Sequence, residues 1–180
     1  MTWLKIKFAI GLGVTALLAG GVAVVALSAD STNKDSQTAI TQPAPMLIVP
    51  GASVGDIRKG MTTNEVEAVL GKPDRWQGQI MVYDKKLGMS VSESKRGVMV
   101  VFCGDSMLRY PGVKTFKGRT KEGIGMESSR AEVIQAFGQP TSAKPWDAGQ
   151  EQLVYRQLGL TFTLESGKVI NMIVDFRTSP

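Results

Sequence analysis

The sequence contains no histidine and only one cysteine, and both absences restrict the chemistry open to this protein. Histidine is the commonest general base and metal ligand, so its absence removes the usual route to acid–base catalysis and metal binding. The single cysteine, Cys103, cannot form an internal disulfide, and the apolar stretch Val98 to Phe102 before it predicts a buried, unreactive thiol. The chain also lacks a Gly-x-Ser-x-Gly elbow and a phosphate-loop pattern. We therefore predict a protein that is not an enzyme and uses no metal or cofactor.

A long apolar run near the amino terminus predicts export. Phe8 to Leu27 is a stretch of twenty residues without a charge, and Lys5 and Lys7 precede it. At ~1.5 Å per residue this length spans the ~30 Å hydrocarbon core of a bilayer. The positive-inside rule then predicts a cytoplasmic-membrane anchor with the carboxy-terminal domain outside the cytoplasm. The alternative is a signal peptide cleaved at Ala26 or Ala29, which would leave a secreted or periplasmic protein.

Small residues recur along this apolar run at alternating steps of four and three. They are Ala9, Gly13, Ala16, Gly20 and Ala23. Such a face lets two membrane helices approach closely, and it is the basis for a homodimer hypothesis. The competing interpretation is that alanine and glycine are simply common in membrane and signal segments.

The segment after the apolar run has the composition of a linker. Asp30 to Pro45 is rich in Ser, Thr, Asn, Gln and Pro, and it lacks the apolar surface needed to offset the entropy of ordering. Met46 to Val49 is a short apolar run between prolines, which we interpret as an edge strand or a plug onto the folded body. The predicted organisation is a membrane anchor or signal (1–29), a flexible linker (30–50), a first repeat (51–112) and a second repeat (113–180).

The strongest pattern in the chain is a helix signature that occurs twice. Each copy has a capping box, in which a hydroxyl at the helix start is followed three residues later by a glutamate. Each copy also ends at Gly-x-Pro, where glycine can cap the helix and proline cannot continue it. The two copies are Thr62 with Glu65 before Gly71-Lys72-Pro73, and Ser129 with Glu132 before Gly138-Gln139-Pro140. The duplication predicts two related structural units.

Short strands are predicted after each helix. Leu160 to Leu164 alternates apolar and polar residues, as a half-buried strand does, and Glu151 to Arg156 and Val169 to Phe176 flank it. Matching segments in the first copy are Gln79 to Tyr83, Gly88 to Ser92 and Val98 to Cys103. We predict an α+β fold in which each repeat packs short helices on a three-stranded antiparallel meander, after an amino-terminal transmembrane helix.

These motifs together resemble the BamE/SmpA-like domain. The residues that carry the likeness are Gly60-Met61, Glu65-Val66 and Tyr83 in the first copy, and Gly125-Met126, Glu132-Val133 and Tyr155 in the second. The resemblance covers residues 54–103 and 122–176 and implies two short helices on a three-stranded sheet in each unit. The tandem arrangement is similar to the architecture of β-lactamase inhibitory proteins, in which two units grip a protein. One feature departs from the family: BamE-type lipoproteins carry a cysteine just after the signal, and Ala26 to Ser31 has none.

A basic stretch lies between the repeats. Residues 109–121 contain no acidic residue, and their basic residues are Arg109, Lys114, Lys117, Arg119 and Lys121. We weigh two interpretations, a solvated connector and a contact for anionic lipid headgroups or an acidic partner. Nucleic acid is not expected as a partner, because the domain is exported and carries no recognisable nucleic-acid motif.

The candidate protein-binding residues come from two arguments. Tryptophan is common among interface hot spots, and one follows the Gly-x-Pro of each repeat. Reading Leu160, Phe162 and Leu164 as inward-facing puts a second set on the opposite side of the sheet. The candidates are Trp76, Trp146, Arg156, Thr161, Thr163, Asn171 and Asp175. Alternatively, each tryptophan covers the contact between the helix and the sheet of its own repeat.

The sequence thus predicts a membrane-tethered, exported protein-binding module with an envelope protein as its partner, in cell-envelope assembly or maintenance. The alternatives are an inhibitor of an extracytoplasmic enzyme and a self-associating structural scaffold.

Overall fold

A computed structural model describes residues 46–104, 112–147 and 149–178. The chain divides into two units, Met1–Ile40 and Thr41–Pro180, and every described residue belongs to the second. Within the described residues, no helix has the length and apolar character needed to cross a bilayer. The anchor predicted at Phe8 to Leu27, with its small residues from Ala9 to Ala23, lies outside the described residues. Residues 30–45 of the predicted linker do so too, whereas its last residues, 46–50, are described and include the strand β1 (Leu47–Val49).

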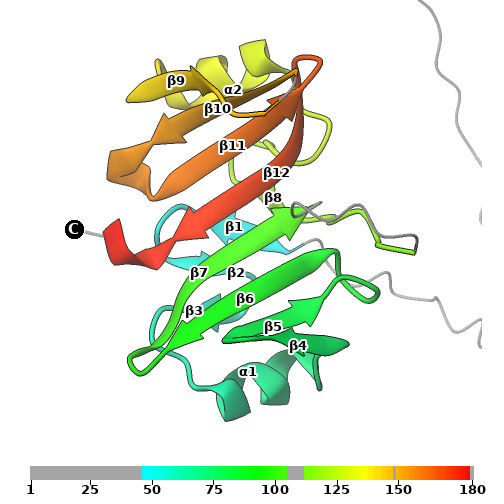
Figure 1. The fold of residues 1–180 in the computed structure, drawn as a ribbon. Helices are drawn as coiled ribbons and strands as arrows, with labels where there is room; N and C mark the ends of the chain where they lie inside the picture. Colours follow the sequence, from blue (N-terminus) through cyan, green and yellow to red (C-terminus); the bar gives the residue numbers. More distant parts are fainter. Residues whose placement is uncertain (1–45, 105–111, 148, 179–180) are drawn as a thin grey trace, which may run out of the picture. The chain divides into compact units, whose positions relative to one another are not determined.

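Eight strands form one antiparallel sheet, in the order β4-β5-β6-β7-β12-β11-β10-β9 (Figure 1). The strands of the first repeat are β4 (Arg75–Gln77), β5 (Ile80–Tyr83), β6 (Met89–Ser94) and β7 (Gly97–Gly104). Those of the second are β9 (Ser142–Pro145), β10 (Gln150–Tyr155), β11 (Leu160–Glu165) and β12 (Lys168–Asp175). The last strands of the two repeats, β7 and β12, pair with each other at the centre of this large sheet.

The prediction of an α+β fold built from two three-stranded meanders is therefore wrong. The described part of the chain is mostly β, with an eight-stranded antiparallel sheet and two α-helices. Each repeat has a fourth strand directly after its Gly-x-Pro, and the pairing of Asn171 with Gly104 through Asp175 with Val100 joins the halves. Joining them in this way satisfies the backbone groups of β7 and β12 that would otherwise be sheet edges.

Both helices form where the capping boxes predict them. α1 (Thr63–Leu70) has Thr62 as its N-cap, and α2 (Arg130–Phe137) has Ser129. In each, the cap hydroxyl accepts from the N3 backbone and the N3 glutamate accepts from the cap backbone. Each glutamate carboxylate accepts a hydrogen bond from the cap backbone, and the cap hydroxyl makes a weaker contribution. These interactions lower the pKa values of Glu65 and Glu132 below their ordinary value of 4.5. The capping roles of the two glutamates are confirmed.

A tyrosine fixes the end of each helix to the large sheet. The Tyr83 hydroxyl donates to the carbonyl of Gly71 at 3.1 Å, and the Tyr155 hydroxyl donates to the carbonyl of Gly138 at 2.9 Å. These glycines are the C-caps of α1 and α2, whose last carbonyls have no partner inside the helix. Burial, with smaller contributions from nearby carboxylates, raises the pKa of Tyr83 to about 12, and the phenol stays a hydrogen-bond donor. The tyrosine of the repeated motif therefore has a structural role.

A valine of the repeated pattern fixes the start of each helix in the same way. Val98 on β7 exchanges backbone hydrogen bonds with Gly60 and Met61, just before α1. Val169 on β12 exchanges them with Glu127 and Ser128, just before α2. Each helix is thus attached at both ends to its own half of the large sheet.

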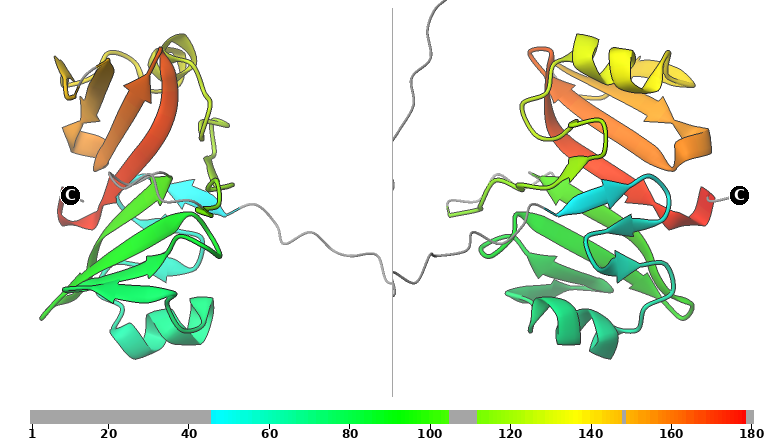
Figure 2. Two further views of the ribbon diagram at one scale, coloured as in Figure 1. Left: turned by 45° about the vertical axis from the view of Figure 1, so that its right-hand side comes forward. Right: turned by 180° about the vertical axis from the view of Figure 1, so that it is seen from behind.

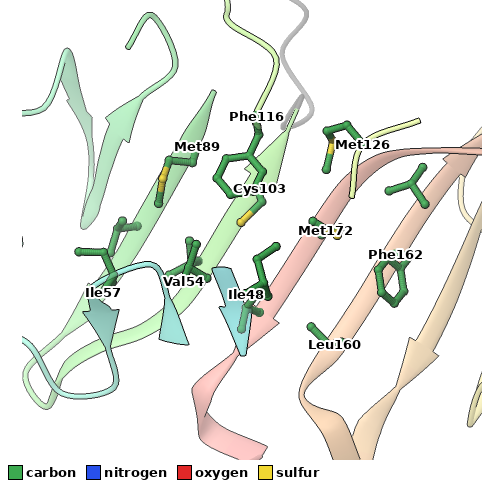
Figure 3. Close-up of a cluster of buried hydrophobic side chains, with 14 of the residues drawn as sticks. Ile48, Val54, Ile57, Met89, Cys103, Phe116, Met126, Leu160, Phe162 and Met172 are labelled. Carbon is green, nitrogen blue, oxygen red and sulfur yellow. The ribbon is translucent and has the colours of Figure 1, made fainter. Parts of the chain in front are cut away.

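A second, smaller sheet covers the junction between the halves. Its order is β3-β2-β1-β8, from β1 (Leu47–Val49), β2 (Ser53–Val54), β3 (Ile57–Arg58) and β8 (Arg119–Thr120). Ile48, Val54 and Ile57 point from this small sheet into the core, towards β6, β7 and β12 (Figure 3). The run Met46 to Val49 therefore forms an internal strand that plugs the junction, since β1 has a neighbour on each side.

The single cysteine lies in this core. Cys103 is fully buried on β7, next to the side chains that the small sheet contributes (Figure 3). Burial raises the pKa of its thiol, so the nucleophilic thiolate is not formed at neutral pH. The prediction of a buried thiol is confirmed.

Candidate protein-binding surface

The two faces of the large sheet are covered very differently. Both helices and the small sheet lie on one side of it, as the two views of Figure 2 show. The opposite face, which we call the open face, carries no other element of the described chain. An open sheet face on a protein of this size is the natural place to look for a binding surface.

Register places one row of side chains across the whole open face. Directly paired residues of antiparallel strands share a face, so the row can be followed strand by strand. From one edge to the other it consists of Ser142, Val154, Thr161, Ile173, Phe102, Ser90, Val82 and Arg75. Phe102 and Ile173 lie at its centre, where the two repeats meet, and both are half-buried. The open face is therefore a single surface with contributions from both halves.

Rows on either side of this one are mainly small and uncharged. One contains Lys144, Gln152, Thr163, Asn171 and Gly104. The other contains Gln77, Ile80, Ser92, Val100 and Asp175. Lys144 and Arg75 end their rows on the outermost strands, and Asp175 ends the third row on β12, opposite Val100. The middle of the open face is therefore largely neutral, with hydroxyl and amide groups around an apolar centre.

The polar groups of the open face are already organised by hydrogen bonds. The Gln152 amide donates to the Thr163 hydroxyl at 3.4 Å. Asp175 accepts two side-chain hydrogen bonds from Arg177, at 2.9 and 2.6 Å, and these lower the pKa of its carboxyl. At the far edge, Arg75 donates to Asp84 at 2.8 Å. Each of these charges is thus paired with an opposite charge, Asp175 at the end of β12 and Arg75 on the edge strand β4.

Four of the predicted binding residues lie on the open face. The inward positions Leu160, Phe162 and Leu164 are buried, which confirms the strand register used for the prediction. Thr161, Thr163, Asn171 and Asp175 consequently face the other way. Thr161 and Asp175 are half-buried, whereas Thr163 and Asn171 are each under a tenth exposed. Arg156 lies off the sheet, in the exposed turn η1 (Arg156–Leu158).

The two tryptophans do not form a matched pair. Both are exposed, Trp76 at 48% and Trp146 at 47%. Trp76 is opposite Met81 in β5, and Met81 is fully buried on the covered face, so Trp76 belongs to that face. Trp146 follows β9, and the Lys144 ammonium, which is on the open face, lies 5.4 Å from its ring centroid. Only Trp146 therefore borders the open face.

Part of the open face is absent from the sequence-based candidates. Val100, Phe102 and Ile173 make up its apolar centre, and Ser90 and Ser92 extend it across the first repeat. The alternation Met89 to Ser92 carries a signal for this face, but the pairing of β7 with β12 is needed to place it beside the second repeat.

The basic candidates lie away from the open face. Lys114, Lys117 and Lys121 are exposed on the segment around β8, and Arg119 is exposed on β8 itself. Arg109 lies outside the described residues. Within the described part of the chain, no three His, Cys, Asp or Glu side chains are close enough together to hold a metal ion.

No protein-family model matches the chain, and no curated protein matches it. Two solved structures are similar. A DUF4309 family protein (YjgB) from Bacillus subtilis subsp. subtilis str. 168 aligns at 14% identity over 63% of this chain and 77% of its own, with a TM-score of 0.44. An extracellular protein containing a SCP domain from Bacillus anthracis str. Ames aligns at 11% identity over 67% of this chain and 45% of its own, with a TM-score of 0.40. At these scores, neither likeness carries an argument about function.

Proposed function

We propose that this protein is a membrane-tethered, exported binding module that holds another envelope protein against its open face. The observation that supports the proposal is the largely neutral middle of that face, with Phe102 and Ile173 at the centre. Arg75 and Lys144 lie on the two outermost strands, and Asp175, opposite Val100, has its charge paired with Arg177. Interfaces between proteins show the same arrangement, because charged residues are depleted from the interface core and frequent around it. A surface for nucleic acid would instead need basic residues across its middle.

The size of the open face fits one protein partner. Seven spacings of about 4.8 Å between eight strands, and about 3.3 Å per residue along a six-residue strand, give a flat area of roughly 700 Å². A standard interface buries about 800 Å² on each partner. A partner of ordinary globular size could therefore occupy most of the face without contact to the helices.

The apolar segment Phe8 to Leu27 supports the tethered part of the proposal. A bilayer-spanning length with lysines before it holds the body on the exported side, where a partner in envelope assembly or maintenance would be met. The resemblance to BamE/SmpA-like domains belongs to this proposal as well. The capped helix and the sheet-bound tyrosine of each repeat agree with it. The single α-helix and four large-sheet strands of each repeat depart from the two helices and three strands that the resemblance implies.

Site-specific photo-crosslinking in the producing cell tests the proposal. A photoreactive amino acid at Thr161 or at Ser92 probes the open face in each repeat, and one at Ala131, exposed on α2, is the control. We expect Thr161 and Ser92 to capture the same envelope protein and Ala131 to capture none of it. Equal capture from all three positions would contradict the proposal. A crosslink to a second copy of this chain would contradict binding to another protein and would support the self-associating scaffold instead.

A further inference from the structure

The outer face of the small sheet exposes two aliphatic side chains side by side along one strand. Leu47 and Val49 are 51% and 40% exposed, whereas Ile48 between them is fully buried in the core. Both therefore point away from the large sheet, on the side of the molecule opposite the open face. Figure 2 shows β1 on that side, with no described element in front of it.

An arginine lies on each side of this aliphatic pair. Leu47 is paired with Arg119 of β8, and Val49 is paired with Ser53, which is paired with Arg58 of β3. The Arg119 guanidinium donates to the Gly123 carbonyl at 2.8 Å. Within the described residues, neither arginine forms an ion pair, although the charge of Arg119 acts on the Glu132 carboxylate and contributes to the lowered pKa of that group.

The net positive charge of the described residues comes from this small sheet and its connections. Residues 46–60 and 112–125, which form the small sheet and its connections, contain six basic and two acidic residues. The other described residues contain eleven basic and eleven acidic ones. The net positive charge of the described residues therefore comes from the small sheet and its connections. Lys117 and Lys121, which flank β8, contribute to it and are exposed.

The amino-terminal segment enters the fold at this face. Only 18 residues separate Leu27, the last residue of the apolar run, from Met46 at the start of β1. A flexible chain of that length has an end-to-end distance of about 25 Å. If Phe8 to Leu27 spans the membrane, the start of the small sheet lies within reach of the lipid surface.

We propose that the outer face of the small sheet docks on an anionic membrane surface. Leu47 and Val49 enter the interfacial region, and Arg58 and Arg119, with the neighbouring lysines, contact lipid phosphates. A hydrophobic anchor combined with a basic, partly apolar surface gives the two contacts that stable membrane association requires. The orientation leaves the open face directed away from the membrane and accessible to a protein. This inference rests on the proposed tether for its geometry.

Fluorescence quenching with the full-length chain in lipid nanodiscs tests it. Ala52, exposed in the turn between β1 and β2, is replaced by cysteine and labelled, while the buried Cys103 stays unlabelled. The control label is at Ala143→Cys, exposed on β9 at the edge of the large sheet. Phosphatidylcholine carrying a nitroxide on its headgroup is the quencher, with or without phosphatidylglycerol. In discs with phosphatidylglycerol, we expect at least about fivefold stronger quenching at position 52 than at position 143.

Removal of the two charges is the decisive comparison. The variant Arg58→Ala with Arg119→Ala should reduce quenching at position 52 to the level of the control label, as should high salt. Lys85→Ala with Arg96→Ala, two exposed cations of the first repeat, should leave it unchanged. Equal quenching at both labels, or equal quenching in phosphatidylcholine alone, would overturn the inference. A label that responds to added poly-L-glutamate and not to anionic lipid would also overturn it, in favour of an acidic protein.

Failure of the tether gives a different result. If Phe8 to Leu27 does not hold the chain in the bilayer, the protein will separate from the discs at high salt. In that case, vesicles of phosphatidylcholine and phosphatidylglycerol are added to the free chain. Quenching at position 52 would then still support the lipid-docking face, and its absence would overturn that inference separately.

Discussion

Replacing Phe162 by alanine is expected to lower the free energy of unfolding by about 3–5 kcal/mol, the usual cost of removing a buried phenylalanine. Phe162 is fully buried on β11. Its ring centroid lies 5.7 Å from that of Phe137 on α2 and 5.8 Å from that of Tyr155 on β10. Phe137 and Tyr155 are also in edge contact, so the three rings form one cluster between helix and sheet. Urea denaturation followed by circular dichroism measures the change.

The neighbouring Thr161 provides the matched control for that substitution. Its side chain is half-buried on the open face, and Thr161→Ala should change the free energy of unfolding by less than about 0.5 kcal/mol. Because β7 and β12 join the halves in one sheet, Phe162→Ala should also leave a single unfolding transition. Tryptophan fluorescence and circular dichroism that give two separate midpoints would contradict the shared sheet.

The second large effect is expected at the hairpin turn of the first repeat. Gly97 is the first residue of β7 and has φ +82°. A Cβ atom at this position would lie 2.2 Å from the carbonyl oxygen of Gly60. Gly167 occupies the matching turn of the second repeat with φ +76°, and a Cβ there meets nothing within 4 Å. Gly167→Ala should cost about 1–2 kcal/mol for the left-handed backbone alone. Gly97→Ala adds an overpacking cost of about 1–3 kcal/mol.

The same urea titrations compare these two glycine variants. The φ angles of the two glycines are similar, so we attribute the difference between the variants to the close approach of Gly97 to Gly60. Equal losses would mean that the turn between β6 and β7 does not rest on the segment before α1. A larger loss for Gly167→Ala would contradict the described packing of both turns.

The helices and the inner strands could be predicted because their signals are local. The capping boxes at Thr62 and Ser129 and the alternation from Leu160 to Leu164 each determine structure within a few residues. The short edge strands β4 and β9 were missed, since Arg75–Gln77 and Ser142–Pro145 have no apolar alternation. The pairing of β7 with β12 joins segments about seventy residues apart, and no local pattern specifies it.

The candidate site was predictable to the same extent. Alternation alone placed Thr161 and Asn171 on the correct face, because the register of β11 follows from its buried leucines. It could not supply Phe102, which reaches the same face only through the strand pairing between the repeats. The tryptophans appeared equivalent, yet Trp76 is three residues after Pro73 and Trp146 is six after Pro140. An odd difference along a strand changes the face, which explains why they lie on opposite sides.

The most direct test of the account is the affinity of the purified full-length chain for the protein captured at Thr161. Thr161→Arg places a charge in the neutral middle of the open face, and Gln135→Arg places the same charge on the exposed surface of α2. We expect Thr161→Arg to weaken binding at least tenfold, which corresponds to about 1.4 kcal/mol. Gln135→Arg should leave the affinity unchanged, and both variants should unfold like the parent. Unchanged affinity for Thr161→Arg, or an equal loss in both variants, would contradict the claim that the open face binds the partner.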